Sequence, residues 1–592
     1  MSTDPSSNPA ASDAVEESTF PTDDGTELFY RKWPARSGKP RGAIILLHRG
    51  HEHGGRVAHL VEELGLGDFT FYAWDARGHG RSPGERGYSP SFAASVRDLD
   101  SFVKHICRTG GFAIEDIAVI AQSVGAVLAA TWVHDYAPRI RALVLASPAF
   151  SVKLYVPFAR EGIWLWQKLK GQFFVNSYVK AKFLTHDPAR IASFDNDPLV
   201  TRAIASNILL DLYTNAERVV ADARAITVPT QLLISGSDWV VRHGPQHRFY
   251  ENLAHPLKER HVLRGFYHDT LGEKERAIAV THARRFILAC FDTEPEPLDV
   301  TNAHQTGFTR DEQDRLSSPH DLLSLKGLYW AIYRSSIRFS ALFSKGLKTG
   351  VETGFDSGST LDYVYENEPR GMGPGGRLID KQFLNAIGWR GIRQRKLHLQ
   401  ELIGFALTRL QDAGRTTHIL DIAAGHGRYV LDAIAKSAVK PTSVRLQDYA
   451  PINVDAGRKS IAERGIQDIA SFHQADAFDA EQLAAIQPAP DLAIVSGLYE
   501  LFPDNALIKR SLGGLATSMQ SGSLLIYTNQ PWHPQLEMIA RALTSHRGGE
   551  AWVMRRRTQA EMDQLVAAAG FRKIDQLVDE WGIFTVSIAE RT

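Results

Sequence analysis

Three side chains in the first half of the chain have the types and order of a nucleophilic catalytic triad. Ser123 follows the apolar run "IAVIAQ", Asp238 follows "QLLISG" and His268 lies just past "RHVLRG". A serine hydroxyl attacks esters efficiently when a histidine takes its proton and a carboxylate orients that histidine. We therefore predict a serine hydrolase site formed by these residues. Asp269 is a weaker acid candidate, because a sequence neighbour of the histidine rarely reaches the far side of its ring.

The turn that carries the serine reads Ala121-Gln122-Ser123-Val124-Gly125. A strand that runs through such a turn into a helix presents serine at a nucleophile elbow, whose usual pattern is G-x-S-x-G. Alanine is the next smallest residue after glycine, so Ala121 should add little steric strain to the turn. The turn therefore favours a working elbow. A serine at an ordinary strand–helix junction is the alternative that this turn alone leaves open.

Residues 26–292 alternate short apolar runs with amphipathic stretches. The strand candidates are "GAIILLH", "FTFYAWD", "IAVIAQ", "IRALVLAS", "PTQLLISG" and "RHVLRG", with helical periods such as "SFAASVRDLDSFVKHIC" between them. This alternation predicts an α/β fold with a mostly parallel sheet covered on both faces. Serine, acid and histidine then follow in the order that α/β-hydrolases use, each past a strand.

Two loops complete a set of motifs around these strands. "LLHRGHEHGGR" follows the third strand and "WDARGHGRSPGERG" follows the fourth. Together with the serine turn and the late acid and histidine, they make residues 26–292 resemble the monoacylglycerol lipase and lysophospholipase group of α/β-hydrolases. The resemblance implies an acyl-enzyme mechanism and an oxyanion hole formed by the backbone N–H groups of Gly50 and Val124.

The first of these loops departs from the pattern of the group at two positions. Arg49 and Gly54 stand where the group has glycine and serine. Arg49 could narrow the acyl channel or bind an anionic headgroup. The loop histidines His51, His53 and His59 lack metal-ligand spacing, so we predict no metal site.

An aromatic segment, "YVPFAREGIWLWQKLKGQFFVNSYVKAKF", separates the run "LVLASPAF" from the acid strand. We predict a lid over about residues 150–215. Its aromatic side chains could roof the active site, or sink into a membrane interface with the lysines at the headgroups. In the resembling group this region is the cap that admits acyl chains.

A second set of polar residues follows the strands of another α/β series that begins near residue 401. "HILDIAAGHGRYV" places Asp421 before a turn with Ala423, Gly425 and Gly427, where the backbone can approach a ligand at a helix start. Asp448 ends the next strand, in "SVRLQDY", and could accept hydrogen bonds from ribose hydroxyls.

A third strand end, in "HQADAFD", places Asp476 and Ala477 where an adenine amine could be recognised. NAD binding would require G-x-G-x-x-G, but Arg428-Tyr429-Val430 follow the second glycine. Residues 401–592 resemble class I S-adenosylmethionine-dependent methyltransferases, with Ala423 in place of the first glycine of the usual motif. The resemblance implies a Rossmann-like fold and S-adenosyl-L-methionine as cofactor.

Residues 326–400 look mainly helical, and we predict that they form a cap over the methyl-acceptor site. Two arginine groups, Arg390 and Arg393 with their neighbours and "VMRRR" at 553–557, could bind a phosphate, although a solvated basic face is the simpler interpretation. Tyr499, Glu500 and His533 are weak acceptor-site candidates.

The remaining composition limits the class of protein. A chain of 592 residues is too long to fold around a single hydrophobic core. Lys+Arg and Asp+Glu are both 67, which gives no general bias toward nucleic acid.

We expect a disordered tail over 1–25 and a linker over 293–325, with neither a signal peptide nor a membrane span. The two cysteines, Cys107 and Cys290, suit a reducing compartment. We predict a cytoplasmic enzyme that can contact the inner face of the membrane peripherally.

The fused arrangement resembles bacterial bifunctional α/β-hydrolase/class I methyltransferases, which implies two active sites. We predict an enzyme that hydrolyses acylglycerol or lysophospholipid-like esters and methylates a lipid or lipid-derived acceptor. One alternative is a pair of sites that form and cleave a methyl ester of a small non-lipid acid. Another, based on Ala121, Arg49 and Ala423, is that one half is catalytically inactive and serves as a binding module.

Overall fold

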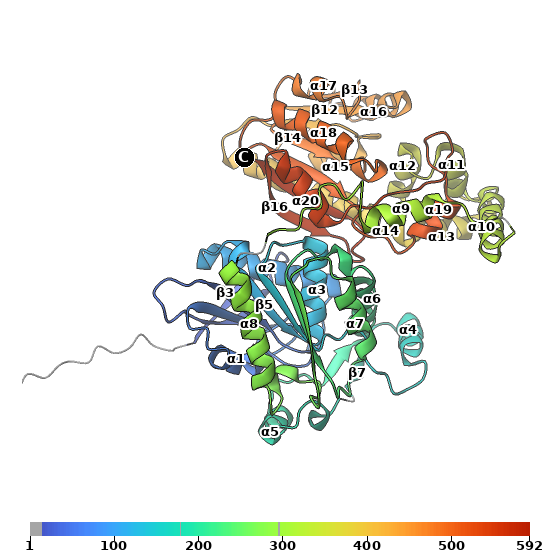
Figure 1. The fold of residues 1–592 in the computed structure, drawn as a ribbon. Helices are drawn as coiled ribbons and strands as arrows, with labels where there is room; N and C mark the ends of the chain where they lie inside the picture. Colours follow the sequence, from blue (N-terminus) through green and yellow to red (C-terminus); the bar gives the residue numbers. More distant parts are fainter. Residues whose placement is uncertain (1–14, 178, 294–295, 322) are drawn as a thin grey trace, which may run out of the picture. The chain divides into compact units, whose positions relative to one another are not determined.

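The computed structural model describes residues 15–177, 179–293, 296–321 and 323–592, so the first fourteen residues of the expected disordered tail lie outside the described residues. The chain divides into two compact units, Met1–Leu298 and Asp299–Thr592, which are coloured blue to green and green to red in Figure 1. Each unit is built on its own sheet and is described separately.

The first unit contains an eight-stranded sheet in the order β1-β2-β4-β3-β5-β6-β9-β10. Its strands are β1 (Glu16–Pro21), β2 (Glu27–Trp33), β3 (Gly42–Leu47), β4 (Phe69–Trp74), β5 (Ile117–Gln122), β6 (Ala142–Ala146), β9 (Thr230–Ser235) and β10 (Lys258–Leu263). Only the β1–β2 and β2–β4 pairs among these are antiparallel. Every residue of β3 and β5 is buried, because helices cover both faces of the sheet. The predicted α/β-hydrolase fold is confirmed.

Helices connect and cover these strands in Figure 1. They are α1 (His59–Glu63), α2 (Phe92–Gly110), α3 (Val124–Tyr136), α7 (His243–Asn252) and α8 (Ala277–Thr293). α2 begins at a side-chain cap, where Ser91 accepts a hydrogen bond from the Ala94 amide. Parallel strands joined through helices bring the carboxyl ends of β5, β9 and β10 to one edge, where the predicted triad residues follow.

The expected disorder over residues 1–25 is wrong for its last part. Glu16–Pro21 form the edge strand β1, antiparallel to β2. Phe20 is fully buried and lies 4.7 Å, ring to ring, from Phe102 on α2. This single apolar anchor and the strand pairing order a segment whose other side chains are polar and exposed.

The predicted lid is an insertion between β6 and β9. It contains α4 (Ala159–Lys170), β7 (Phe174–Asn176), α5 (Pro188–Asn196), β8 (Ala203–Ala205) and α6 (Ser206–Ala221), with β7 and β8 paired antiparallel. None of the residues of α4 is buried, and Trp164, Trp166 and Leu169 are 54%, 52% and 68% exposed. The aromatic side chains of α4 therefore lie on the surface of the unit.

The second unit contains a seven-stranded sheet in the order β13-β12-β11-β14-β15-β17-β16. Its strands are β11 (His418–Asp421), β12 (Ser443–Asp448), β13 (Ala470–Gln474), β14 (Leu492–Val495), β15 (Leu524–Asn529), β16 (Phe571–Val578) and β17 (Thr585–Arg591). β17 is antiparallel to both neighbours, and the other pairs are parallel. The strand order reverses between β11 and β14, the place where such sheets bind ligands. The predicted Rossmann-like fold is confirmed.

Helices of the second unit fall into two groups. Those that accompany the strands are α15 (Arg428–Lys436), α16 (Pro451–Glu463), α17 (Ala480–Ala484), α18 (Asn505–Ser518), α19 (Leu536–Ala542) and α20 (Gln559–Ala568). Those of the helical middle are α10 (Leu325–Ala341), α11 (Lys345–Thr353), α12 (Gly358–Glu366), α13 (Gly373–Leu384) and α14 (Ile387–Asp412). α14 runs through the boundary expected at residue 400 and packs Leu399, Leu402 and Leu407 into the core beside the sheet.

The expected linker over 293–325 differs from the structure beyond residue 298. Residues Phe308–Ser317 form helix α9, and the Asn505 side chain donates to the Thr301 carbonyl at 2.9 Å. Glu312 of α9 pairs with Arg556 at 2.5 Å. The segment is polar in sequence because its partners are buried polar groups far along the chain.

Candidate active sites

Ser123 occupies a sharp turn between β5 and α3. Its backbone has φ 56° and ψ −115°, a conformation that costs energy for a residue with a side chain and that a nucleophile elbow imposes. A Cβ at Gly125 would lie 2.4 Å from the His48 carbonyl, so glycine is required there. Ala121 is fully buried between β3 and β6, where its methyl group is accommodated. The structure thus contains the elbow that the sequence favours.

The three predicted triad residues are connected by hydrogen bonds. Ser123 Oγ lies 2.7 Å from His268 Nε2, and His268 Nδ1 lies 2.8 Å from Asp238 Oδ2. The other carboxylate oxygen of Asp238 accepts hydrogen bonds from the Val240 and Val241 amides at 2.7 and 2.9 Å. Burial raises the pKa of Asp238, but the His268 ring and these amides outweigh it and hold the pKa below its usual value. An ionised carboxylate therefore orients the imidazole.

The two residues expected to form an oxyanion hole lie side by side. A Cβ at Gly50, just beyond β3, would meet Val124 Cγ2 at 2.9 Å. Val124 is the first residue of α3, where a backbone N–H has no partner within the helix. In the described parts of the chain, neither amide donates a hydrogen bond. The loop before Gly50 is held by His48, whose Nε2 accepts from the Ala76 amide at 3.1 Å.

Two carboxylates of the first unit hold the side chain of Arg49, the residue that departs from the motif of the group. Its side chain is buried and pairs with Glu52 at 2.6 Å and with Asp269 at 3.5 Å. Asp269 also accepts from Gln122 at 3.0 Å and from Arg190 of the lid helix α5 at 3.1 Å. Asp269 therefore ties three segments together, while Asp238 is the carboxylate that contacts the His268 ring.

The predicted cofactor residues of the second unit surround the turn between β11 and α15. Gly425 and Gly427 have φ values of 58° and 72°, which glycine adopts without strain. Asp448, at the end of β12, accepts a hydrogen bond from the Gly425 amide at 2.9 Å. Asp421 is buried and accepts from Tyr429 Oη at 2.5 Å and from the Ala423 amide at 3.3 Å. Burial raises the pKa of Asp421 to about 7.

A small cavity of about 50 Å³ lies over this turn. It is lined by Gly358, Leu361, Asp362, Tyr365, Arg395, Ala423, Ala424, Gly425, His426, Arg428, Tyr429 and Ser496. Helix α12 forms one wall, since Asp362 pairs with Arg428 at 2.5 Å. The helical middle therefore covers the glycine turn itself. Sequence reasoning missed Asp362 and Tyr365, because the polar face of a short helix gave no signal of a ligand site.

Of the predicted cofactor residues, Ala423 and Gly425 line the cavity, and the others lie outside its lining. Asp476 caps its own turn by accepting from the Phe478 amide at 2.9 Å, and Ala477 is buried in the core. Among the acceptor candidates, Tyr499 is buried and bonds Ser511 at 2.9 Å. Glu500 accepts from Thr528 at 2.7 Å and lies 3.7 Å from Arg395, a cavity residue. Glu500 therefore contacts a residue of the cavity wall without lining the cavity itself.

Three basic acceptor candidates have structural contacts instead. His533 is buried and accepts from the Gln535 amide at 3.0 Å, and burial lowers its pKa to about 4. Arg390 stacks over the Trp581 ring, with its guanidinium carbon 4.5 Å from the ring centre. Arg393 donates to the Leu384 carbonyl at 2.8 Å.

The arginines of "VMRRR" form neither a phosphate site nor a solvated face. Arg555 is buried against Glu561 at 2.5 Å, and Arg557 donates to the Tyr499 carbonyl at 2.5 Å. Glu561 follows Thr558, which caps α20 by accepting from the Glu561 amide at 3.2 Å. The Glu561 carboxylate therefore pairs with Arg555, and only its amide takes part in the helix cap.

Two general features of the described residues concern metals and membranes. They contain no group of three or more His, Cys, Asp or Glu side chains that could hold a metal ion. Within the same residues, every helix is too short or too polar to cross a lipid bilayer.

Comparison with known proteins relates each unit to a family. The model of a family described as "Putative methyltransferase" matches residues 283–591, and that of "Serine aminopeptidase, S33" matches residues 38–275. The chain is 56% identical over 575 residues to "Uncharacterized protein YnbC" of Escherichia coli (strain K12), covering 97% of this chain and 98% of that protein. It is 25% identical to "Monoacylglycerol lipase" of Mycolicibacterium smegmatis, covering 46% of this chain and 97% of that protein. A solved Paleococcus ferrophilus monoacylglycerol lipase aligns with TM-score 0.40 and 24% identity, covering 45% of this chain and 99% of that one.

Proposed function

The chain belongs to the methyltransferase family whose model covers residues 283–591, and we propose that it joins two reactions on lipids. The first unit, a serine hydrolase domain, hydrolyses acyl esters of acylglycerol or lysophospholipid type. The second unit transfers a methyl group from S-adenosylmethionine to a lipid or lipid-derived acceptor. The observation that carries the proposal is the continuous chain of hydrogen bonds from Ser123 through His268 to Asp238.

Ester hydrolysis follows from the roles that these atoms can play. Ser123 Oγ attacks the ester carbonyl while His268 Nε2 takes its proton, and Asp238 stabilises the imidazolium through Nδ1. The amides of Gly50 and Val124 are placed to receive the oxyanion. His268 then gives the proton to the leaving alcohol, and water hydrolyses the acyl-serine by the same steps. The name of the Mycolicibacterium relative, monoacylglycerol lipase, supports a glycerol ester as substrate.

The residues around the glycine turn fit a nucleoside cofactor that has an amino-acid end. The space beside the Gly425 Cα is open, and the Asp448 carboxylate lies next to it. Arg395 Nε and Glu500 Oε2 are buried without hydrogen-bond partners among the described residues. Arg395 therefore offers a positively charged donor, and Glu500 offers a negatively charged acceptor. When bound, S-adenosylmethionine supplies an electrophilic methyl group. Asp448 would hold its ribose hydroxyls, and Arg395 and Glu500 its carboxylate and ammonium groups.

Lid helix α4 supports the choice of lipids as substrates. Its exposed Trp164 and Trp166 are followed by Lys168 and Lys170, and Lys168 Nζ lies 5.0 Å from the centre of the Trp164 ring. Such a helix can lie in a membrane interface with its aromatic side chains sunk and its lysines at the headgroups. Replacing both tryptophans with serine should reduce co-sedimentation with phosphatidylglycerol vesicles by about tenfold. Unchanged vesicle binding would contradict this contact, and hydrolysis of a soluble ester serves as the control for folding.

The test of the two-reaction proposal uses the full chain, S-adenosylmethionine with an isotopically labelled methyl group, and a total bacterial lipid extract. Mass spectrometry should find the label in a lipid. Comparison with Ser123→Ala then shows whether hydrolysis precedes methylation. If the cofactor binds but no lipid carries label, the lipid acceptor is wrong, and methylation of a small acid becomes the explanation to test.

A further inference from the structure

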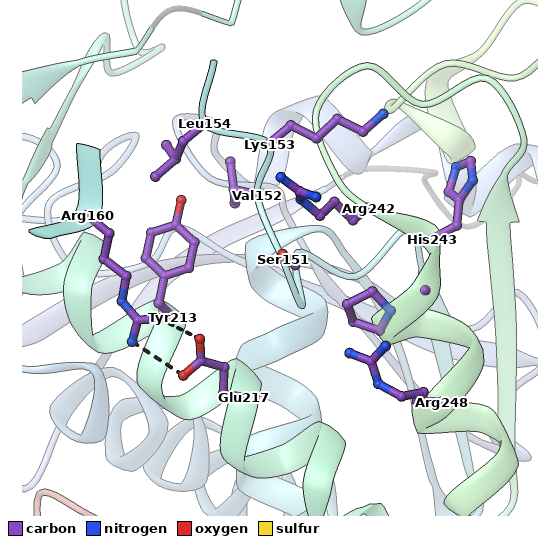
Figure 2. A pocket seen from close by; sticks show the side chains of 12 residues that line it. Ser151, Val152, Lys153, Leu154, Arg160, Tyr213, Glu217, Arg242, His243 and Arg248 are labelled. Atoms are coloured by element: carbon purple, nitrogen blue, oxygen red, sulfur yellow. Dashed lines mark hydrogen bonds and ion pairs between the residues drawn. The ribbon is translucent and has the colours of Figure 1, made fainter. Parts of the chain in front are cut away.

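A cavity of the first unit lies beside the predicted lid, and its lining contains none of the triad residues. Its volume is about 720 Å³, and its lining consists of Ser151, Val152, Lys153, Leu154, Arg160, Tyr213, Glu217, Arg242, His243, Gly244, Pro245 and Arg248. Figure 2 shows Arg160 and Tyr213 on one side of this space and Arg242, His243 and Arg248 on the other. We call it the arginine cavity.

The charge of the arginine cavity is strongly positive. Three arginines and a lysine line it, against one carboxylate, Glu217, which already pairs with Arg160. Arg242 and Arg248 are exposed, and among the described residues neither has an acidic partner. Two uncompensated guanidinium groups that face one cavity repel each other, and a bound anion removes that repulsion.

Unsatisfied polar atoms in the cavity wall also point to a ligand. Tyr213 Oη and His243 Nε2 are buried without hydrogen-bond partners in the described parts of the chain. Burial raises the pKa of Tyr213 to about 12, so its hydroxyl is a donor at neutral pH. Guanidinium, ammonium and hydroxyl donors arranged around one space match an anion with several acceptor oxygens, as a phosphate group has.

The wall of the arginine cavity is hydrogen-bonded to the catalytic acid loop. Lys153 Nζ donates to the Asp238 carbonyl at 2.5 Å, and the Arg242 amide donates to the Ser151 carbonyl at 2.9 Å. Val241, whose amide bonds the Asp238 carboxylate, bridges to Val152. A group held in the cavity is therefore fixed relative to the triad by a short, rigid path.

We propose that the arginine cavity binds a phosphate group, which gives the hydrolase a preference for acyl esters whose alcohol part carries phosphate. This inference rests on the proposed ester hydrolysis. A single carboxylate would leave most of the positive charge unpaired, whereas the doubly charged phosphate monoester balances the two free arginines.

Direct binding tests the site independently of catalysis. Ser123→Ala protein is titrated calorimetrically with glycerol 3-phosphate, with inorganic phosphate and with glycerol as the neutral control. We expect both phosphates to bind and glycerol not to bind. Combining Arg242→Gln with Arg248→Gln should weaken phosphate binding by at least about tenfold. Glu217→Gln, which frees Arg160, should strengthen it several-fold, and Arg108→Gln on α2 is the matched control with no effect. Absence of phosphate binding, or binding unaffected by Arg242 and Arg248, overturns the site.

Kinetics then decide whether the phosphate belongs to the substrate. The kcat/KM values of wild-type enzyme are compared for a monoacylglycerol and an acylglycerol 3-phosphate of the same chain, both below their micelle concentrations. The phosphate ester should be preferred by at least about tenfold, and the double arginine variant should remove that preference. Phosphate binding without an altered ratio would assign the site to free phosphates and overturn the substrate preference. If neither ester is hydrolysed, the proposed ester hydrolysis fails, while the calorimetric result still decides the phosphate site.

Discussion

The two units differ in whether their own side chains are enough for the proposed reaction. In the first unit, the proposed nucleophile, base and acid are joined by hydrogen bonds of 2.7 and 2.8 Å. In the second unit, Asp448 accepts from the Gly425 amide, while Arg395 Nε and Glu500 Oε2 have no hydrogen-bond partner among the described residues. Hydrolysis requires only water besides the ester, whereas methyl transfer requires a group from outside. The geometry of the first site therefore points to a reaction, whereas the geometry of the second site points to a class of ligand.

The largest expected effect separates the two sites completely. Ser123→Ala removes the nucleophile and should lower kcat for ester hydrolysis by about 10⁶-fold. S-Adenosylmethionine binding, measured by calorimetry on the same protein, should not change. Hydrolysis that survives the substitution would refute the triad, and loss of cofactor binding as well would show that the two units are not independent.

The next effect distinguishes two neighbouring buried carboxylates. Asp238→Asn should lower kcat by about 10⁴-fold without unfolding, because the imidazole then takes the wrong tautomer. Asp269→Asn removes the carboxylate that pairs with Arg190 and one of the two that pair with the buried Arg49, so it should lower the free energy of unfolding by about 3 kcal/mol. Steady-state kinetics and chemical denaturation measure the two effects. The reverse pattern would make Asp269 the acid.

A moderate effect tests the ligand class of the second unit. Asp448→Ala should weaken S-adenosylmethionine binding about 100-fold, because the ribose loses its acceptor while the Gly425 amide loses its partner. Asp455→Ala, an exposed acid on α16, is the matched control. Equal affinities for wild type and both variants would remove Asp448 from the cofactor site.

The smallest expected effect concerns His134, a buried group of the first unit that lies outside the triad. Burial lowers the pKa of His134, but Asp135 at 2.6 Å and Asp222 at 2.8 Å raise it above its usual value. The protonated form therefore stabilises the fold below the unfolded pKa of about 6.5 and loses this role as pH rises through the folded pKa. His134→Gln should cost about 2 kcal/mol at pH 6 and clearly less at pH 9, by urea denaturation. A cost that does not depend on pH would show that His134 is neutral.

The sequence predicted the elements and residues whose signals are local. Ser123, Asp238 and His268 each follow a strand of the sheet, and parallel strands bring such ends together. Asp421 and Asp448 were found in the same way beside a glycine turn. In both units, regular alternation of strands and helices was enough to place these residues at one edge of a sheet.

The predictions that failed depend on partners far along the chain. The arginine run at 555–557 looked solvated, yet Asn505 accepts from both Arg555 and Arg557 inside the unit. The polar segment after residue 298 looked like a linker because nothing in it reveals the buried Arg556 with which it pairs. Arg242, just before α7, and Arg248, within it, gave no signal either, since lone arginines are typical of a protein surface.

Helix α14 has a consequence for exchanging parts between related proteins. Its 26 residues begin in the helical middle and end against the sheet, with Leu399 and Leu410 almost fully buried in one core. A recombination point at residue 400 would cut this helix in half and leave each fragment below the length at which a helix is stable alone. Fragments that keep function would instead begin at residue 299, so the helical middle and the methyltransferase core are inherited and engineered as one module.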